Sequence, residues 1–286
     1  MIGKKILRYT YAGLDKFYIS LDKTLVRRTR NLRLVPDYGK RRGGKIAYGE
    51  WCHVIGIFQT ILYTHMNGNK DNNILDVGCG TGIVGIACEP FLGKNGRYIG
   101  IDVSRADIDF CKKHFSSPRY AFQHLNVKNP TYSPEQVSAQ KKWNVENNSM
   151  DMITALSVWT HLNEEDAIFY FNEINRVLKP GGKAIVTFFV LDDLYSHSLK
   201  HRTDAKGKFH STCQNRWIFD NPSSESHDWF HTRWAKYPED AIGITPTGIR
   251  KLTEKTNLTQ EENYIGNWKE IRGVYFQDIL VFRKTI

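Results

Sequence analysis

The sequence has few cysteines and no long apolar segment. The five cysteines are scattered and form no C-x-x-C pair: Cys52, Cys79, Cys88, Cys111 and Cys213. This excludes a disulfide scaffold, shows no zinc signature and is typical of a reducing compartment. No apolar run approaches the ~20 residues that span a bilayer. Arg8 follows Lys4 and Lys5 too closely for the apolar core of a secretory signal, so we expect a cytoplasmic protein.

Glycine and proline are also sparse, with 22 and 9 among 286 residues, which excludes collagen-like and low-complexity chains. A hydrophobic share of 41% is ordinary for a globular protein with a real core.

Positive charge is concentrated at the beginning of the chain. Residues 1–50 hold 13 Lys and Arg against 4 Asp and Glu, out of a net charge of +10. An apolar stripe at helical spacing lies in the same segment: Leu7, Tyr11, Leu14, Tyr18, Leu21 and Leu25. We interpret residues 1–49 as a basic helix-and-loop arm that precedes a domain at 50–286. Two interpretations stay open: residues 1–34 contact an anionic membrane peripherally, at its inner face, or the stripe docks on the domain or on a second copy.

From residue 72 onward, strand and helix patterns alternate. Strands are predicted at 73–77, 97–103, 120–125, 150–156, 183–191, 258–265 and 274–283, and helices at 50–66, 83–91, 105–114, 164–178 and 246–256. Such alternation predicts a doubly wound α/β fold with a mostly parallel sheet and helices on both faces. The last two strands are joined by a short loop, so one of the seven must be antiparallel.

Residues 192–245 interrupt this rhythm and are rich in Trp, Phe and His. A connection of this length is normally a lid or a binding insert. Its aromatic residues could stack on a sugar or an aryl ring, or they could form a small core of their own.

A glycine-rich turn joins the first predicted strand to the next helix. Gly78, Gly80 and Gly82 stand at alternate positions, where the backbone can adopt positive φ and approach a ligand closely. The carboxyl end of such a strand is where an open α/β sheet binds ligands. Gly80, Gly82 and Gly85 also match the dinucleotide pattern G-x-G-x-x-G, but this match alone is weak.

Two carboxylates near this turn favour a cationic nucleoside without phosphates. Asp76 would repel a pyrophosphate and attract a cationic group. Asp102 ends the second predicted strand, where a carboxylate can accept hydrogen bonds from both hydroxyls of a ribose.

On these residues the sequence resembles the class I S-adenosylmethionine-dependent methyltransferases. The resemblance covers residues 70–191 and the two terminal strands, and rests on 76–82, 102, 125–127, 157–161 and 176–182. It implies that the glycines wrap the methionine portion, that Asp102 holds the ribose and that Asn126 caps the adenine, where the family usually has Asp. The cofactor-binding residues that it implies are Asp76, Gly78, Cys79, Gly80, Gly82, Asp102, Val103, Asn126, Val127 and Ser157, around S-adenosylmethionine or its product S-adenosylhomocysteine.

Two stretches resemble motifs of nucleic-acid methyltransferases but stand at the wrong place in the sequence. Residues 129–132 read Asn-Pro-Thr-Tyr, close to the Asn-Pro-Pro-Tyr of nitrogen-methylating enzymes, but they follow the third predicted strand instead of the fourth. We predict a turn there. Cys213 lies in the insert, and no Pro-Cys follows the fourth strand. A nucleic-acid partner is therefore disfavoured.

His161, just after the fourth predicted strand, is the candidate catalytic base. A base with a pKa near neutrality speeds hydroxyl deprotonation by about 10²–10⁴-fold. The alternative is that His161 only caps the next helix or holds its loop. His197 with His201, and His227 with His231, are spaced four apart, but no third ligand accompanies them, so we expect no metal.

We therefore expect a methyltransferase that acts on a small molecule or a saccharide, at a hydroxyl oxygen, by in-line displacement. The arm and the insert would form the acceptor side. Methylation of a metabolite at nitrogen or carbon is one alternative. The other is a membrane-associated scaffold or sensor that binds the nucleoside without turnover.

Overall fold

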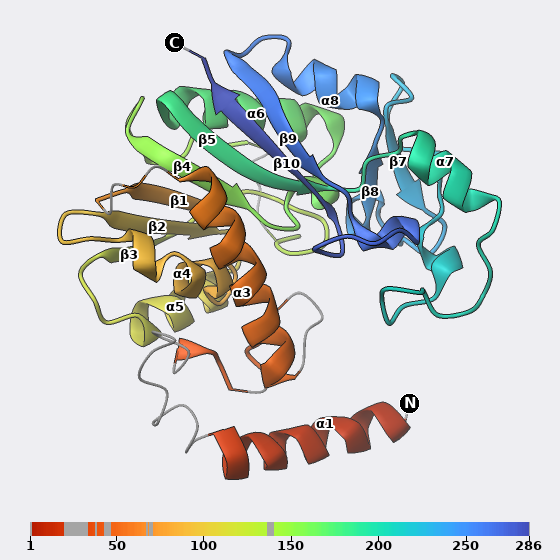
Figure 1. Ribbon diagram of the computed structural model, residues 1–286, viewed down its shortest axis with the longest axis horizontal. Helices are drawn as coiled ribbons and strands as arrows, with labels where there is room; N and C mark the ends of the chain where they lie inside the picture. The colour runs from red at the N-terminus through yellow and green to blue at the C-terminus, as the bar shows by residue number, and fades with distance from the viewer. Residues whose placement is uncertain are drawn as a thin grey trace. The chain divides into compact units, whose positions relative to one another are not determined.

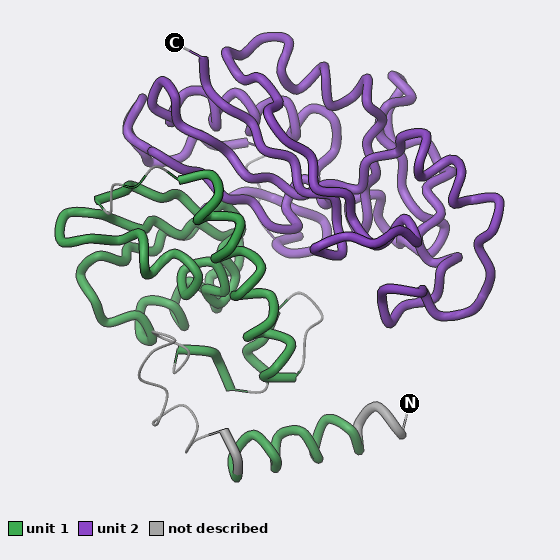
Figure 2. Tube along the Cα trace, in the orientation of Figure 1, with its two compact units in different colours: residues 1–124 green, residues 125–286 purple. Residues whose placement is uncertain are grey.

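A computed structural model describes residues 2–19, 34–37, 39–42, 47–66, 68, 71–135 and 140–285. The chain divides into two compact units, residues 1–124 and 125–286, which Figure 2 shows in different colours. Each unit is described by itself below.

Seven strands form the main sheet, in the order β3-β2-β1-β4-β5-β10-β9 (Figure 1). Strand β2 pairs in parallel with β1 and β3, and β4 pairs in parallel with β5, whereas β10 is antiparallel to both β5 and β9. The predicted α/β fold, a mostly parallel seven-stranded sheet with one antiparallel strand, is thereby confirmed, with helices around the sheet.

The first unit alternates short strands and helices. Its elements are α3 (Tyr48–His65), β1 (Asn73–Val77), α4 (Ile83–Ala87), η3 (Glu89–Phe91), β2 (Arg97–Asp102), α5 (Arg105–His114) and β3 (Tyr120–His124). Helix α5 begins where Ser104 accepts a hydrogen bond from the Asp107 amide, as an N-cap serine does. The strand β1 is buried along most of its length, as a central parallel strand requires.

The second unit holds the other half of the sheet. Its elements are β4 (Met150–Ala155), η4 (Trp159–His161), α6 (Glu164–Val177), β5 (Leu178–Phe188), α8 (Pro246–Thr253), β9 (Leu258–Tyr264), η7 (Asn267–Lys269) and β10 (Asp278–Lys284). Asn163 caps α6 by accepting a hydrogen bond from the Asp166 amide.

The insert, residues 192–245, has secondary structure of its own. It contains α7 (Asp193–Leu199), η5 (Gln214–Trp217), β6 (Phe219–Pro222), β7 (Trp229–Thr232), η6 (Pro238–Asp240) and β8 (Ile242–Ile244). Strands β6, β7 and β8 form a separate three-stranded sheet. Ile244 at the end of β8 bonds to the backbone of Phe189 and Leu191, which follow β5, so the small sheet joins the chain where β5 ends.

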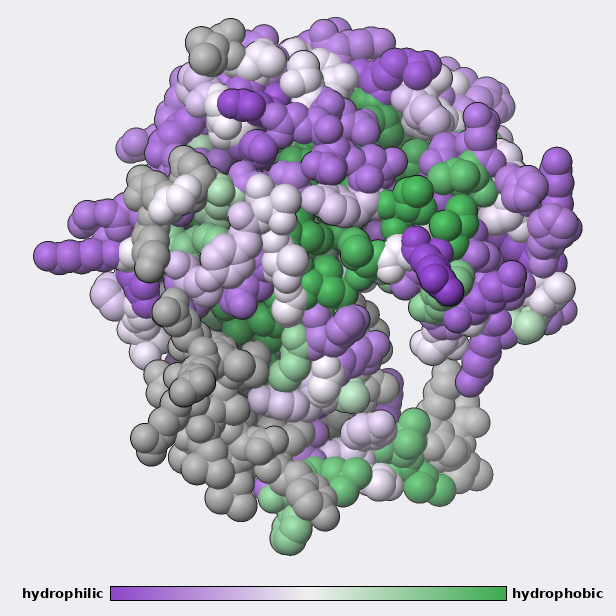
Figure 3. Space-filling view, viewed as in Figure 1, coloured by the Kyte–Doolittle hydropathy of each residue, from purple (hydrophilic) through white to green (hydrophobic). Residues whose placement is uncertain are grey.

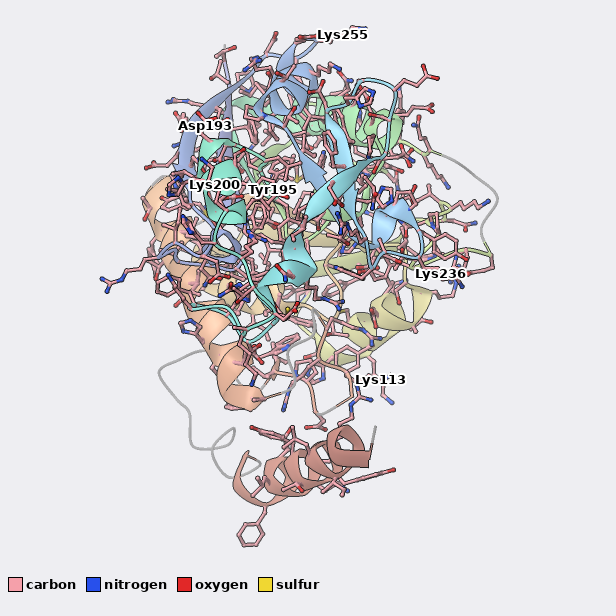
Figure 4. All side chains as sticks on the ribbon, turned by 90° about the vertical axis from the view of Figure 1, so that its right-hand side faces the viewer. Lys113, Asp193, Tyr195, Lys200, Lys236 and Lys255 are labelled. Atoms are coloured by element: carbon pink, nitrogen blue, oxygen red, sulfur yellow. The ribbon has the colours of Figure 1, made fainter. Side chains whose placement is uncertain are left out.

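Aromatic residues of the insert are packed in a small core. Phe189, Tyr195, Phe219, Ala241 and Trp268 form a buried cluster. Figure 4 labels Tyr195, which is buried, together with Asp193 and Lys200 of the same stretch of chain, which are exposed. Most of these rings therefore make a core that holds the insert together, although Trp234 and Tyr237 remain 38% and 42% exposed.

Three predicted boundaries are wrong by four residues or more. The helix expected at 83–91 ends at Ala87, because Pro90 cannot continue an α-helix and lies in the short 3₁₀ turn η3 instead. The strand expected at 183 begins at Leu178, and its pairing with β4 slips between Met150 and Met152 to accommodate the Pro-Gly-Gly stretch. The last strand begins only at Asp278, because the carbonyls of residues 275 and 276 accept hydrogen bonds from η7.

The beginning of the chain is helical, as predicted, over part of the expected stretch. Helix α1 (Ile2–Leu14) continues into a π-helical turn, η1 (Asp15–Ile19). Leu7 and Leu14 of the stripe are 53% and 45% exposed, and α1 shows apolar atoms on its surface in Figure 3. Leu21 and Leu25 lie outside the described residues. Within the described part, no helix combines the length and the apolar character needed to cross a membrane.

Candidate functional site

In the first unit, the glycine-rich turn folds back on the end of β2. The amides of Gly78 and Cys79 both donate to the Ile101 carbonyl, at 2.8 and 3.1 Å. Gly78, Gly80 and Gly82 all have positive φ, at 69°, 49° and 92°. The three alternate glycines are thus required by backbone conformation, as the sequence predicted.

Gly82 has a second reason to be glycine. It is the residue before α4, and a Cβ atom built on it would lie 2.6 Å from two ring atoms of Phe115. Phe115 is itself buried and packs against Tyr120 and Phe122. The turn therefore sits so close to the aromatic core that no side chain fits at residue 82.

Asp102 joins the end of β2 to this turn. Its Oδ2 accepts a hydrogen bond from the Gly80 amide at 2.7 Å, and its Oδ1 accepts one from the Ser104 amide at 2.8 Å. Burial raises the pKa of Asp102, and the two backbone hydrogen bonds oppose that rise. Each carboxylate oxygen can accept a further hydrogen bond. Asp102 could therefore hold the turn and bind two ligand hydroxyls at the same time.

Asp76 and Cys79 lie below the surface of the turn. Asp76 is 1% exposed and accepts a hydrogen bond from the Tyr98 hydroxyl at 2.5 Å. Cys79 is 3% exposed; hydrogen bonding to the Cys111 thiol, together with burial, raises its pKa well above the usual value. Any contact that Cys79 makes with a ligand would come from its backbone. The cationic partner expected for Asp76 stays a prediction.

In the second unit, Ser157 follows β4 in a left-handed conformation with φ of 55°. Such a backbone costs a non-glycine residue about 1–3 kcal/mol and is maintained only by its surroundings. The Ser157 amide donates to the Thr187 hydroxyl at 2.7 Å, and its own hydroxyl donates to Oε1 of Gln277 at 2.9 Å. Gln277, which the sequence analysis did not single out as a site residue, is 6% exposed and also accepts from Thr187.

His161 ends η4 and is held from both sides of its ring. Its Nδ1 lies 2.7 Å from the carbonyl oxygen of Glu239, in the η6 turn of the insert. Its Nε2 lies 3.2 Å from the hydroxyl of Tyr132. A carbonyl only accepts hydrogen bonds, so Nδ1 carries the proton and Nε2 carries the lone pair of a neutral imidazole. Burial lowers the pKa of His161, which favours this neutral form.

Comparison with known proteins now identifies the central segment. A family described as a methyltransferase domain matches residues 74–182, from β1 into β5. The strands of the chain are arranged as in the α/β methyltransferase fold.

Residues 74–182 are therefore similar to a methyltransferase domain.

Two curated relatives of this segment are named after the pathway in which they act. The chain is 26% identical over 114 residues to the ubiquinone biosynthesis O-methyltransferase of Bradyrhizobium sp. (strain ORS 278), a match that covers 40% of this chain and 38% of that protein. It is 28% identical over 109 residues to the protein of the same name in Nitrobacter winogradskyi, covering 38% and 35%. The matches thus cover well under half the length of these relatives.

Solved structures agree in fold. A protein of Pyrococcus horikoshii aligns with a TM-score of 0.53 and 18% identity, over 83% of this chain and 92% of that one. A SAM-dependent methyltransferase of Methanosarcina mazei aligns with a TM-score of 0.50 and 16% identity, over 79% and 97%. At these identities the likeness concerns the fold.

Lys40 and Arg42 of the basic arm lie against the glycine-rich turn. The Thr81 hydroxyl donates to the Lys40 carbonyl at 2.7 Å. Arg42 forms an ion pair with Asp107 of α5, and a Cβ on Gly80 would lie 3.6 Å from its Cγ. The sequence predicts only that residues 1–49 form a basic helix-and-loop arm. Lys40 and Arg42 contact residues that are 41 and 65 positions away in the sequence, so no local sequence pattern could predict these contacts.

Of the remaining predicted site residues, Asn126 and Val127 lie near the start of the second unit, and Val103 lies in the first unit. Asn126 is exposed, Val127 is 4% exposed, and the Val127 carbonyl accepts from the Ser133 hydroxyl. Val103 follows β2, and its carbonyl lies 3.0 Å from Nε2 of His124. Among the described residues, no three His, Cys, Asp or Glu side chains are grouped as metal ligands would be.

The chain fits S-adenosylmethionine on two observations. The turn has three glycines at positive φ, which put no side chain between its backbone and a ligand, and Asp102 presents a carboxylate at the end of β2. When bound, this nucleoside supplies an electrophilic methyl group on a sulfonium.

We expect the variant Asp102→Asn to bind S-adenosylhomocysteine about 10–150-fold more weakly, the equivalent of losing a charge-assisted hydrogen bond worth about 1.5–3 kcal/mol. An amide keeps one acceptor oxygen and cannot serve both backbone amides and a ribose. Calorimetric titration measures the loss. Asp109→Asn is the matched control, because Asp109 is an exposed residue of α5, the helix that follows Asp102 in the chain. Equal affinity in wild type and Asp102→Asn would contradict the ribose role.

Proposed function

We propose that this chain is an S-adenosylmethionine-dependent O-methyltransferase of a small molecule that carries a hydroxyl group, with His161 as the general base. The single observation that carries the base assignment is the 2.7 Å contact between His161 Nδ1 and the Glu239 carbonyl. It fixes the tautomer in which Nε2 can take a proton.

A hydroxyl acceptor suits this base. Hydroxyl groups are weakly nucleophilic while they hold their proton, and a neutral imidazole removes a proton at physiological pH. Methylation at nitrogen or carbon does not need such a group to the same degree. The printed names of the curated relatives, O-methyltransferases of ubiquinone biosynthesis, support an oxygen acceptor, although they match less than half of either chain.

The cofactor side of this proposal uses the predicted residues. Gly78, Gly80 and Gly82 would surround the methionine portion, and Asp102 would bind the ribose. Asn126, Val127 and Val103 would contact the adenine, with Asn126 accepting from its amino group through the amide oxygen. Ser157, fixed by Thr187 and Gln277, would approach the reacting centre from the end of β4.

The role of His161 predicts both a mutational and a pH effect. We expect His161→Gln to lower kcat by about 10²–10⁴-fold while the affinity for S-adenosylhomocysteine stays unchanged. In wild type, kcat/KM should be constant around neutrality and fall as the pH drops through the pKa of His161, because only the neutral ring accepts a proton. Burial lowers that pKa from its usual 6.5, so the fall should occur below pH 6.5.

Suitable probes are 3,4-dihydroxybenzoate and methyl α-D-glucopyranoside, which offer a phenolic and a saccharide hydroxyl. Product formation is followed by mass spectrometry, which locates the added methyl group. Full turnover by His161→Gln would contradict the proposal. So would a better acceptor than these two probes that receives its methyl group on nitrogen or carbon.

A further inference from the structure

The turn at residues 129–133 is built to hold Tyr132 in place. The side-chain oxygen of Asn129 accepts hydrogen bonds from the amides of Thr131 and Tyr132, both at 3.0 Å. The backbones of Asn129 and Ser133 bond to each other in both directions. The sequence analysis predicted a turn here, which is confirmed, but attached no function to its tyrosine.

This turn, the end of η4 and the η6 turn of the insert are joined by hydrogen bonds. The Thr131 hydroxyl donates to Asp240 at 2.8 Å, and the Asn129 amide group donates to the His161 carbonyl at 3.2 Å. The amides of Lys236, which Figure 4 labels, and Tyr237 donate to the other oxygen of Asp240. Tyr132 and His161 are therefore placed by the same set of contacts.

The two side chains meet edge to face. Their ring centroids are 5.0 Å apart at 85°, and the Tyr132 hydroxyl lies 3.2 Å from His161 Nε2. Because Nδ1 donates to the Glu239 carbonyl, Nε2 must accept, so the phenol is the donor. Tyr132 is 53% exposed, whereas His161 is half-buried, so the phenol is the member of the pair that reaches outward.

We propose that Tyr132 is a catalytic residue that binds the acceptor hydroxyl and relays its proton to His161. This rests on the proposed function. A phenolic oxygen can accept one hydrogen bond while its own proton is donated elsewhere. The acceptor hydroxyl therefore donates to Tyr132, which donates to Nε2 of His161.

The oxygen of the acceptor hydroxyl uses a lone pair to form the new O–C bond, the S–C bond of S-adenosylmethionine breaks, and the pair of electrons from that bond stays on sulfur. The hydroxyl proton moves to the oxygen of Tyr132 as the phenolic proton moves to Nε2. The products are a methyl ether, a neutral thioether and an imidazolium, which donates to the Glu239 carbonyl and faces the carboxylate of Asp240.

A spectroscopic test of the contact needs no acceptor. In the full chain labelled with ¹⁵N histidine, His161→Gln identifies the resonances of His161. We expect the Nδ1–H tautomer in wild type. In Tyr132→Phe the pKa of His161 should rise, because the lost phenol stabilised the neutral ring by donating to Nε2. Tyr63→Phe, on another exposed tyrosine, should leave it unchanged. An unchanged pKa in Tyr132→Phe, or an Nε2–H tautomer in wild type, would overturn the relay.

Turnover of 3,4-dihydroxybenzoate tests the relay itself. Tyr132→Phe should lower kcat by about 10²-fold or more and leave the KM for S-adenosylmethionine unchanged, because proton transfer alone is affected. Wild-type kcat in Tyr132→Phe, together with loss of turnover in His161→Gln, would overturn the relay and leave the proposed function standing. Wild-type kcat in both variants would overturn the proposed function as well.

Discussion

Replacing Gly82 with alanine should abolish most of the affinity for S-adenosylhomocysteine and destabilise the fold. The substitution forces a β-carbon onto a residue with φ of 92°, which costs about 1–3 kcal/mol. It also places that atom 2.6 Å from the ring of Phe115. Because Phe115 is packed between other rings, the overlap must be relieved by moving the turn or the core, at a further cost of about 1–3 kcal/mol.

Urea unfolding measures the loss of stability, and calorimetric titration with S-adenosylhomocysteine measures the loss of affinity. We expect the free energy of unfolding to fall by about 2–6 kcal/mol, the sum of the two costs. Affinity should fall by at least ~10-fold, the equivalent of about 1.4 kcal/mol.

Gly181→Ala is the matched control for backbone strain. Gly181 has φ of 79°, but a Cβ built there meets nothing within 4 Å, and the residue lies in β5 of the second unit. It should lose only the conformational contribution, about 1–3 kcal/mol, and bind the ligand normally. If Gly82→Ala behaves no worse than Gly181→Ala in both measurements, the close approach of the turn to Phe115 has no importance for binding.

The turn could be predicted from the sequence because its requirements are local. A strand, three alternate glycines and a helix follow one another within about ten residues. Each glycine is required because its own backbone has a positive φ. The strand Asn73–Val77 and the helix Arg105–His114 were predicted with the bounds that the structure shows. Capping and burial of neighbouring residues decide such bounds.

The surroundings of His161 could not be predicted, because they come from distant parts of the chain. The Glu239 carbonyl lies 78 residues further on, and Thr131 and Asp240 are 109 residues apart. Gln277 reaches Ser157 across 120 residues. No periodicity or motif encodes such pairs, and only the folded insert brings η6 to the histidine. The sequence therefore indicated His161 as a candidate but could not assign its tautomer or its partner Tyr132.

A similar long-range arrangement anchors the insert, and its disruption should have a large effect. Lys269 in η7 is 0% exposed, and its ammonium lies 2.8 Å from Asp192 and 2.9 Å from Asp278. Asp278 is also 0% exposed and accepts hydrogen bonds from the amides of Gly266 and Val190. Asp192 caps α7, so this ion triad links the first helix of the insert to β10.

We expect Lys269→Met to lower the free energy of unfolding by about 3–5 kcal/mol, because Asp278 would keep a buried charge without its cation. Methionine has a similar length and no charge, so the lost volume is small. Lys179→Met is the control. Lys179 is 38% exposed and pairs with Asp151, and exposed pairs of this kind contribute about 0–1 kcal/mol.

The double variant Lys269→Met with Asp278→Asn separates loss of an interaction from the cost of an orphaned charge. Asparagine removes the buried negative charge and keeps one oxygen, which can accept from the Gly266 or the Val190 amide but not from both. If the orphaned carboxylate causes the instability, the double variant should be more stable than the sum of the two single losses predicts. Urea unfolding of the four proteins in the cycle measures this difference. Strictly additive losses would mean that Lys269 and Asp278 act independently, and that the triad does not hold the insert through their pairing.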